Sequence, residues 1–222
     1  MSTWQRIIHL VTKYPLDFST DVFLLVGIAF GLYAVNYLNK TLKVIFLFLA
    51  VCFGIEIILI YYAVRGWNNY FLVNITSLAE TFFFSIVYWI EISDRRNRVI
   101  IISLFGTYLL LFTYSFQWQY IAEFLLGAER SILIVFVILH LQFMLEMMRV
   151  PNLLTYPMFW VSSGTIVYAA GTLFIFTFTK ITFSDPNDMW YWSVAQWFTC
   201  LFYSVLAMSF YLRRREVLLR TV

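Results

Sequence analysis

Apolar residues in this chain form long runs that are separated by short polar segments. Runs of this length are typical of membrane-spanning helices, because about 20 residues at a rise of about 1.5 Å cross a hydrocarbon core of about 30 Å. Strands of a membrane barrel would alternate every second residue, and these runs do not. The pattern therefore predicts an all-α, seven-transmembrane-helix bundle. Its helices are expected at Asp21 to Leu38, Leu42 to Val64, Tyr70 to Ile92, Arg98 to Phe116, Gly127 to Met148, Thr155 to Lys180 and Trp190 to Leu212.

The seven runs and their short connections account for almost all of the 222 residues, so we expect a single transmembrane domain over 1–222. The first residues, MSTWQRIIHLVTKYPLDF, contain no uninterrupted apolar core and no small-residue cleavage site. We therefore expect them to stay in the mature protein. Residues 1–15 are predicted to form an interfacial amphipathic segment, helical over Trp4 to Val11 and stopped by Pro15.

Composition supports a membrane location, since 62% of the residues are hydrophobic and only 12% are charged. Lys and Arg near helix ends then predict the orientation. With the amino terminus outside, ten of the fifteen basic residues fall on the cytoplasmic side, together with the carboxyl terminus. The net charge of +3 reflects this asymmetry. The expected partners are therefore membrane lipids, and nucleic acid is not expected. The outer side keeps Arg6, Lys13, Arg65, Arg130 and Lys180.

Ionisable and polar residues inside the helices are the candidates for function. A charged side chain at the bilayer centre costs about 2.5 to 3.5 kcal/mol, so such residues usually face the bundle interior. Counting about 1.5 Å per residue from the cytoplasmic ends places Glu56, Glu80, Tyr168 and Gln196 in one layer, roughly 18 to 21 Å deep. His140 lies about 12 Å deep by the same count. The layer predicts an intramembrane site that binds a ligand or carries a proton.

One side of the third helix is polar along most of its length. Glu80 is accompanied there by residues at spacings of three and four, which are Asn74, Ser77, Thr81, Ser85 and Tyr88. This spacing places them on one helix face and gives Glu80 an inward direction. If Glu80 and Glu56 lie close together, desolvation and mutual repulsion favour protonation of at least one carboxyl group. Structural hydrogen bonding is the alternative role for these residues.

Small residues mark the helix faces that pack against other helices, because lipid tails give helices no hydrophobic reason to associate. The first helix contains Gly27 and Gly31 at a spacing of four. The sixth and seventh helices contain two longer stripes, formed by Trp160, Gly164, Tyr168 and Gly171, and by Ser193, Gln196, Cys200, Ser204 and Ala207.

Several functions are excluded or made improbable by missing residue types. A retinal Schiff base needs a Lys in the seventh helix, and Lys occurs only at positions 13, 40, 43 and 180. A zinc hydrolase with three His ligands is improbable because the chain has only His9 and His140. Ser162 lies at a depth similar to that of His140, but no GxSxG element surrounds it. We therefore predict no cofactor, no metal and no enzyme activity.

Two segments carry a resemblance to a known family. They are the setting of Glu80, LAETFFF, and the sixth-helix sequence FWVSSGTIVYAAGTLF. Together they resemble a family of small seven-helix membrane proteins from Bacteroidetes whose relatives occur with histidine-kinase systems. The resemblance implies a sensor-like role, a bacterial cytoplasmic (inner) membrane, and a cytoplasmic signalling partner such as a histidine kinase. It draws attention to Glu80, Trp160, Gly164, Tyr168 and Gly171.

The leading hypothesis is a receptor-like or sensor protein whose polar pocket around Glu80 and Glu56 binds a small ligand, with signalling through a separate partner. Tyr168, Gln196, Asn74, His140 and Trp160 complete the set of candidate residues. A small-solute or proton-coupled transporter is the alternative, because some seven-helix transporters consist of two parallel three-helix repeats joined by a fourth helix. A membrane enzyme with Glu and His as acid and base ranks third.

Overall fold

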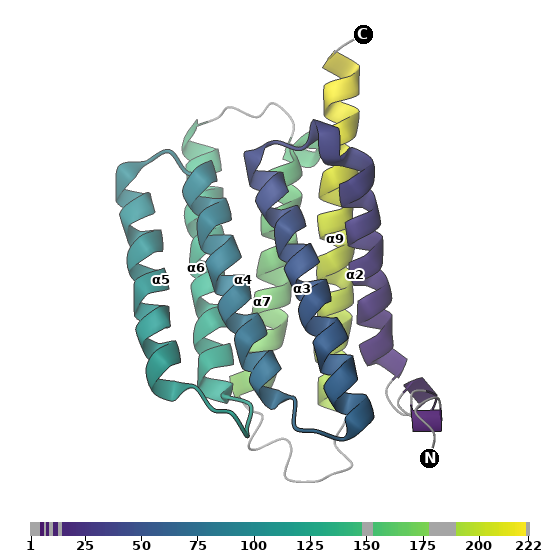
Figure 1. The fold of residues 1–222 in the computed structure, drawn as a ribbon. Coiled ribbons are helices and arrows are strands. Elements are labelled where there is room, and N and C mark those ends of the chain that lie inside the picture. Colours follow the sequence, from purple (N-terminus) through teal and green to yellow (C-terminus); the bar gives the residue numbers. More distant parts are fainter. Residues whose placement is uncertain are drawn as a thin grey trace.

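The computed structural model describes residues 15–147, 153–177 and 190–220, together with residues 5, 6, 8, 11 and 12. The described part is all-helical, and its seven long helices are each long and apolar enough to cross a membrane. They form the bundle shown in Figure 1. The chain is therefore an integral membrane protein with a seven-helix bundle. The helices are α2 (Pro15–Ala34), α3 (Lys40–Arg65), α4 (Tyr70–Glu91), α5 (Arg95–Ser115), α6 (Glu123–Met147), α7 (Pro157–Thr177) and α9 (Trp190–Arg220).

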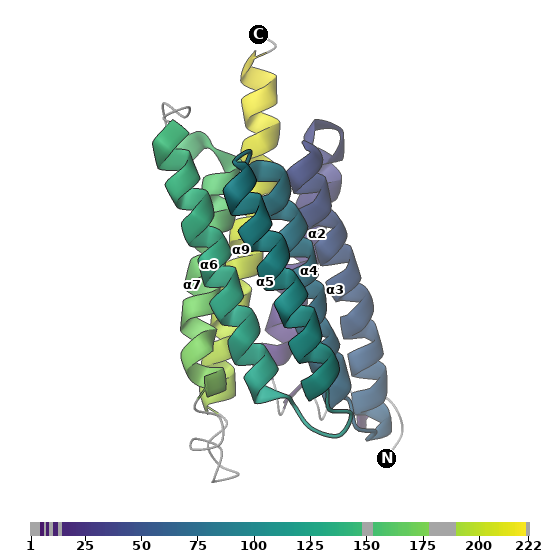
Figure 2. The same ribbon diagram turned by 90° about the vertical axis from the view of Figure 1, so that its left-hand side faces the viewer.

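Six of these helices form a closed ring, and α5 lies outside it. The ring follows the chain in the order α2, α3, α4, α6, α7 and α9, and α9 then packs against α2. α5 packs mainly against α4 and α6, and it lies in front of them in the side view of Figure 2. Only Ile101 and Tyr108 of α5 are buried. The bundle interior is therefore enclosed by six helices from two consecutive groups of three, and α5 connects the groups.

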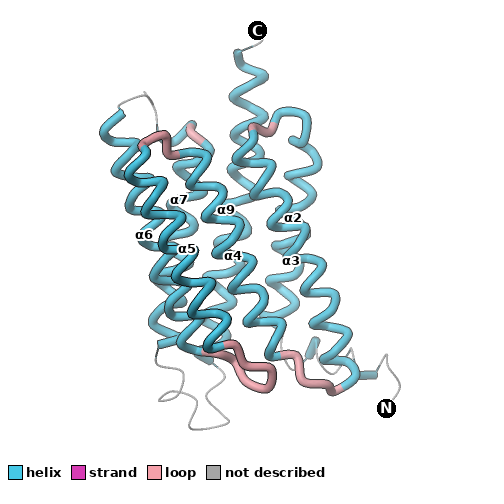
Figure 3. The backbone as a smooth tube through the Cα atoms, turned by 60° about the vertical axis from the view of Figure 1, so that its left-hand side comes forward, coloured by secondary structure: helices cyan, strands magenta, loops and turns pink. Residues whose placement is uncertain are grey.

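All the helices run roughly along one axis, as the tube in Figure 3 shows. We call the end at which α2 begins the N-terminal end, and the opposite end, where α9 projects beyond the other helices, the C-terminal end (Figure 1). Local signals define the helix ends. The Asn39 side chain accepts a hydrogen bond from Leu42 N (2.9 Å) at the start of α3, and Gly66 ends that helix with φ of 71°. Asp94 likewise caps α5.

Three of the helix boundaries that differ from the sequence prediction affect the bundle interior or its projecting end. α2 begins at Pro15 rather than Asp21, because proline fits the first turn of a helix and Asp17 in that turn favours the helix dipole. α6 begins at Glu123 rather than Gly127, which moves Glu129 and Arg130 from the first turn of the predicted helix to the second turn of the observed one. α9 continues to Arg220, past the predicted end at Leu212. The apolar pattern ends at Leu212 because the following residues, beginning with three Arg, are charged, but they continue the helix. The first difference brings new acids, and the second a new base, into the bundle.

Small residues let the ring helices approach closely, as predicted. A Cβ atom on Gly164 of α7 would lie 2.9 Å from Val205 Cγ1 of α9, and one on Gly31 of α2 would overlap the Phe46 ring of α3. A Cβ atom on Gly171 would likewise overlap the Phe198 ring of α9. The predicted α7 stripe therefore faces α9, and no larger residue fits these contacts without a shift.

The half of the bundle near the C-terminal end is solidly packed. Its interior is filled by large side chains that are fully buried, among them Phe48, Phe84, Tyr88, Phe136, Phe202 and Phe210. Between this core and the C-terminal end of the bundle, Glu91 of α4 accepts hydrogen bonds from Thr41 of α3 (2.9 Å) and from the Tyr156 hydroxyl just before α7. Burial beside Glu91 raises the pKa of Tyr156 above its ordinary value, so this hydroxyl remains a donor. One carboxyl group thus joins three helices at the C-terminal end.

Two predicted segments lie largely or wholly outside the described residues. The amphipathic segment at residues 1–15 is described only at Pro15 and the five single positions given above, and the predicted end of the sixth helix, at residues 178–180, lies outside the described residues.

Candidate functional site

A cavity of about 420 Å³ occupies the half of the bundle near the N-terminal end. Its walls come from all six ring helices, and within the described chain α5 contributes nothing to them. The cavity runs from the first turn of α2, at Asp17, to Glu80 and Tyr168 in the middle of the bundle. This volume lies in the range of small-molecule sites, about 300 to 1,000 Å³. The polar and charged lining residues are Asp17, Thr20, Asp21, Glu56, Asn69, Thr76, Ser77, Glu80, Arg130, Tyr168, Thr172, Gln196, Thr199 and Tyr203.

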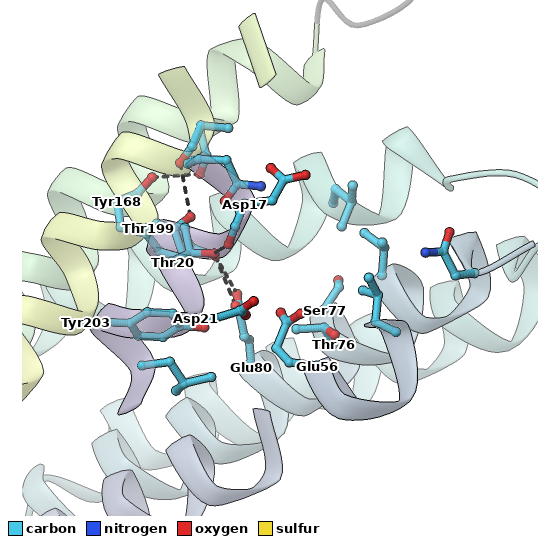
Figure 4. A pocket seen from close by; sticks show the side chains of 18 of the residues that line it. Asp17, Thr20, Asp21, Glu56, Thr76, Ser77, Glu80, Tyr168, Thr199 and Tyr203 are labelled. Carbon is cyan, nitrogen blue, oxygen red and sulfur yellow. Dashed lines mark hydrogen bonds between the residues drawn. The ribbon is translucent and has the colours of Figure 1, made fainter. Parts of the chain in front are cut away.

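The predicted layer of Glu56, Glu80, Tyr168 and Gln196 lines this one cavity. These residues come from α3, α4, α7 and α9, and the estimate of equal depth brought them together correctly. Figure 4 shows the Glu56 and Glu80 side chains turned toward the same part of the cavity. Their role in binding a ligand or carrying a proton stays a prediction.

A buried ion-pair network forms the inner end of the cavity. Arg130 of α6 donates from Nη1 to both Glu80 and Glu129, and from Nη2 to the Tyr168 hydroxyl (2.6 Å). Tyr168 in turn donates to Glu80 Oε1 (3.0 Å). Arg130, Glu80 and Glu129 are 4%, 4% and 0% exposed. Because charges this deep need partners, the network explains how Glu80 is tolerated within an apolar helix.

Aromatic rings complete the surroundings of Arg130. The guanidinium carbon lies 4.2 Å from the centroid of the Tyr168 ring and 5.5 Å from that of Phe176, both in α7. The Tyr168 ring stacks on Phe202 of α9, with centroids 4.5 Å apart and an interplanar angle of 6°. Tyr168 therefore holds Arg130 by its ring and its hydroxyl, and its own position is fixed by stacking.

Sequence reasoning missed Arg130 and Glu129. It placed Arg130 at the outer helix end, but the early start of α6 puts it inside the bundle. A signal existed, since Arg130, Leu133, Val137 and His140 follow at spacings of three, four and three and share one buried helix face. Removing Arg130 from the outer count leaves ten basic residues against four, which makes the charge asymmetry larger than predicted.

Glu80 and Glu56 have different neighbours. Glu80 accepts hydrogen bonds from Arg130 and Tyr168, whereas Glu56 lines the cavity together with Asp21 and Asp17 of α2. The reason is that Arg130 reaches Glu80 from α6, which the sequence depth count could not show. No ion pair compensates Asp21 or Glu56 within the described chain. The cavity therefore has a paired charge at its inner end, whereas Asp21 and Glu56 on its wall have no ion-pair partner among the described residues.

Asn74 lies outside the cavity and anchors a loop. Its side-chain amide donates to the carbonyl oxygens of Gln117 (2.8 Å) and Tyr120 (3.1 Å), and its Oδ1 accepts from Ala122 N (3.0 Å). These three bonds fix the connection between α5 and α6 to the start of α4. The geometry gives Asn74 a structural role in place of the predicted place in the pocket.

His140 and Trp160 also lie away from the cavity. His140 Nδ1 is 2.8 Å from Ser162 Oγ of α7, and Tyr88 of α4 is 3.3 Å from the same oxygen. All three side chains are fully buried in the packed half of the bundle. The Trp160 indole donates to Leu154 O (2.8 Å) near the C-terminal end. Neither residue lines the cavity, and their role in binding a ligand or carrying a proton stays a prediction.

The arrangement can bind a small molecule without any further side chain. Apolar and aromatic walls surround a few convergent polar groups, which is the usual composition of ligand sites. Among the described residues, no group of three or more His, Cys, Asp or Glu is placed to hold a metal ion.

The fold and the cavity define the class of protein, which is a seven-helix integral membrane protein with a charged interior cavity. Comparison with known protein families, with curated proteins and with solved structures finds no match to this chain.

Proposed function

We propose that this protein is a receptor-like or sensor protein of a bacterial cytoplasmic membrane, with a small ligand bound in the cavity and a separate cytoplasmic partner that responds. The observation that carries the proposal is the cavity itself. Residues from six helices line it, so a ligand that contacts several walls changes the free energy of their mutual packing.

The position of the cavity supports a receptor. It lies in the half of the bundle at the N-terminal end, which the positive-inside rule assigns to the outside. Toward the C-terminal end the interior is filled by buried aromatic side chains. Ligand binding on one side and a packed core on the other favour signal transfer through helix movement over passage of a solute.

The C-terminal end supplies surfaces that a partner can read. α9 projects past the other helices (Figure 1) and presents Arg213, Arg214 and Arg215. Arg213 donates to Tyr37 O at the end of α2 (3.3 Å), and the Arg214 guanidinium carbon lies 3.8 Å from the centroid of the Tyr33 ring. α2 and α9 both line the cavity, so a shift between them changes this basic surface. A histidine kinase, which the family resemblance implies, is the partner we propose.

A ligand screen with the purified protein in lipid nanodiscs tests the proposal. We expect ligands from a metabolite library to raise thermal stability, and to change hydrogen exchange at the C-terminal half of α9. Ala63→Trp, which fills the cavity wall, should abolish both effects, as should Glu80→Ala at its inner end. Glu146→Gln, an exposed change at the C-terminal end of α6, is the matched control. Stabilisation that survives Ala63→Trp, or a screen without any hit, would contradict a cavity receptor.

One observation favours proton-coupled transport as a second candidate. Two carboxyl groups, Glu80 and Glu129, share the single guanidinium of Arg130, so the buried network carries one carboxyl group in excess. A proton would balance it. The two groups of three ring helices joined by α5 also agree with a repeat-based transporter. Solute uptake into proteoliposomes that depends on a pH gradient and is lost in Glu129→Gln would establish this function instead.

A further inference from the structure

The chemistry of the cavity wall identifies a class of ligand, an inference that rests on the proposed binding function. Four carboxyl groups line the cavity, those of Asp17, Asp21, Glu56 and Glu80. Arg130 is the one basic residue among the described lining residues, and its guanidinium already serves Glu80 and Glu129. Asp21 and Glu56, which have no ion-pair partner among the described residues, therefore give the wall an excess of negative charge that a neutral or anionic ligand would leave uncompensated.

The negative groups are concentrated on two neighbouring helices. Asp21 of α2 and Glu56 of α3 both line the cavity, and Figure 4 shows both side chains directed into the same space. Bringing two carboxyl groups together in a partly dehydrated site is unfavourable unless a cation joins them. A positive charge between Asp21 and Glu56 would interact with both.

A second feature, independent of the acids, is a polar group at the inner end without a partner. Arg130 has a side chain that is 5% exposed and lines the cavity, and its Nε donor has no hydrogen-bond partner within the described chain. Unsatisfied buried donors are uncommon in folded proteins. A hydroxyl or other acceptor of a bound ligand at the inner end of the cavity would satisfy this donor.

The rest of the wall favours an organic cation over a bare ion. Aromatic rings of Phe18, Tyr70, Phe176 and Tyr203 line the cavity, together with aliphatic residues of α2, α3 and α4. Aromatic faces attract ammonium groups, and quaternary ammonium recognition commonly combines rings with nearby acids. Inorganic cations instead need several oxygen ligands at short distance.

We propose that the cavity binds a small organic cation, an amine or quaternary ammonium compound, through Asp21, Glu56 and the aromatic wall. The ammonium group lies between the two carboxylates, and its substituents contact the rings. A hydroxyl or other acceptor on the ligand faces Arg130.

Three isosteric probes of different charge test this assignment with the full chain in nanodiscs. They are choline, its neutral carbon analogue 3,3-dimethylbutan-1-ol, and the anion 3,3-dimethylbutanoate. n-Butylammonium with butan-1-ol forms a second matched pair. We expect at least one cation to bind about tenfold or more tightly than its neutral partner, measured by calorimetry, since a tenfold change corresponds to about 1.4 kcal/mol. The anion should not bind measurably.

Two isosteric variants locate the charge. Asp21→Asn and Glu56→Gln should each weaken cation binding by about tenfold, because each removes one charge next to the ammonium group. Neither should weaken binding of the neutral analogue. Glu146→Gln should leave both unchanged. Size-exclusion profiles and thermal unfolding of the unliganded variants confirm that they fold, and the neutral analogue provides an internal check of cavity integrity.

The outcomes separate this inference from the proposed function. Equal binding of cation and neutral analogue, or cation binding unaffected by both variants, overturns the assignment while a cavity receptor stands. The same holds if neither cation binds but the library screen yields other ligands. A screen in which nothing binds removes the receptor and the ligand class together.

Discussion

Replacing Arg130 with Met is the sharpest test of the buried network. The substitution keeps an unbranched side chain of similar length, but it removes the donors to Glu80, Glu129 and the Tyr168 hydroxyl. Both carboxyl groups are then buried without a cation. Breaking a buried ion pair by removing one partner costs about 3 to 5 kcal/mol. The folding equilibrium constant should therefore fall by roughly a hundredfold to several thousandfold.

Neutralising the whole network should reverse most of that loss. The triple variant Arg130→Met, Glu80→Gln, Glu129→Gln leaves no uncompensated charge, and its amides can hydrogen bond to Tyr168. Replacement of a buried ion pair by neutral groups is often close to neutral in stability, so we expect a loss of about 2 kcal/mol or less. The triple variant should thus be more stable than the single one.

Equilibrium unfolding in mixed detergent micelles, followed by tryptophan fluorescence, measures these differences. A double-mutant cycle between Arg130 and Glu80 gives the coupling energy directly. The partly exposed pair Arg213 and Glu216 of α9, at 2.8 Å, is the matched control, and its coupling should stay below about 1 kcal/mol. If Arg130→Met is as stable as the triple variant, or if the two pairs couple equally, the ion-pair network does not exist as described.

Three further predictions concern a helix–helix contact, a loop anchor and the orientation of the chain. Gly164→Ala should destabilise the bundle by about 1 to 3 kcal/mol, because the new Cβ would lie 3.1 Å from Val205 Cβ, whose position is set by the α9 backbone. Gly54→Ala, whose Cβ meets nothing within 4 Å, should be neutral in the same unfolding assay. Asn74→Ala should raise hydrogen exchange and protease cleavage specifically at residues 117–122, and an unchanged loop would contradict the anchor. Green fluorescent protein fused to the carboxyl terminus should fluoresce in cells, as it does only in the cytoplasm; a dark fusion, with a reporter at the amino terminus active inside, would reverse the orientation.

The seven spans could be predicted from the sequence because hydropathy and length alone decide which segments can cross a bilayer. The depth count also worked for Glu56, Glu80, Tyr168 and Gln196, since helix rise is constant and all helices cross the same layer. These are properties of single helices, and they do not depend on how the helices are arranged.

The network around Arg130 could not be found in this way. Its recognition depends on where α6 starts, and apolar patterns locate helix ends only to within a few residues. The chemistry of the cavity was missed for a related reason, since Asp17 and Asp21 were read as lying before or at the start of the first helix. Asn74 and His140 were included among the candidate residues because they are polar groups within helices, and Trp160 because of the family resemblance. The hydrogen-bond partners of all three depend on tertiary neighbours that the sequence does not show.

The position of α5 outside the ring has a topological consequence. Six helices alone would complete the ring, but an even number of crossings would return the chain to the face on which it entered. α5 makes one additional crossing, so that α4 and α6 run in the same direction as neighbours and the total is odd. α5, which does not line the cavity, therefore makes the number of helix crossings odd. It places the projecting end of α9 at the end of the bundle opposite to the half that contains the cavity.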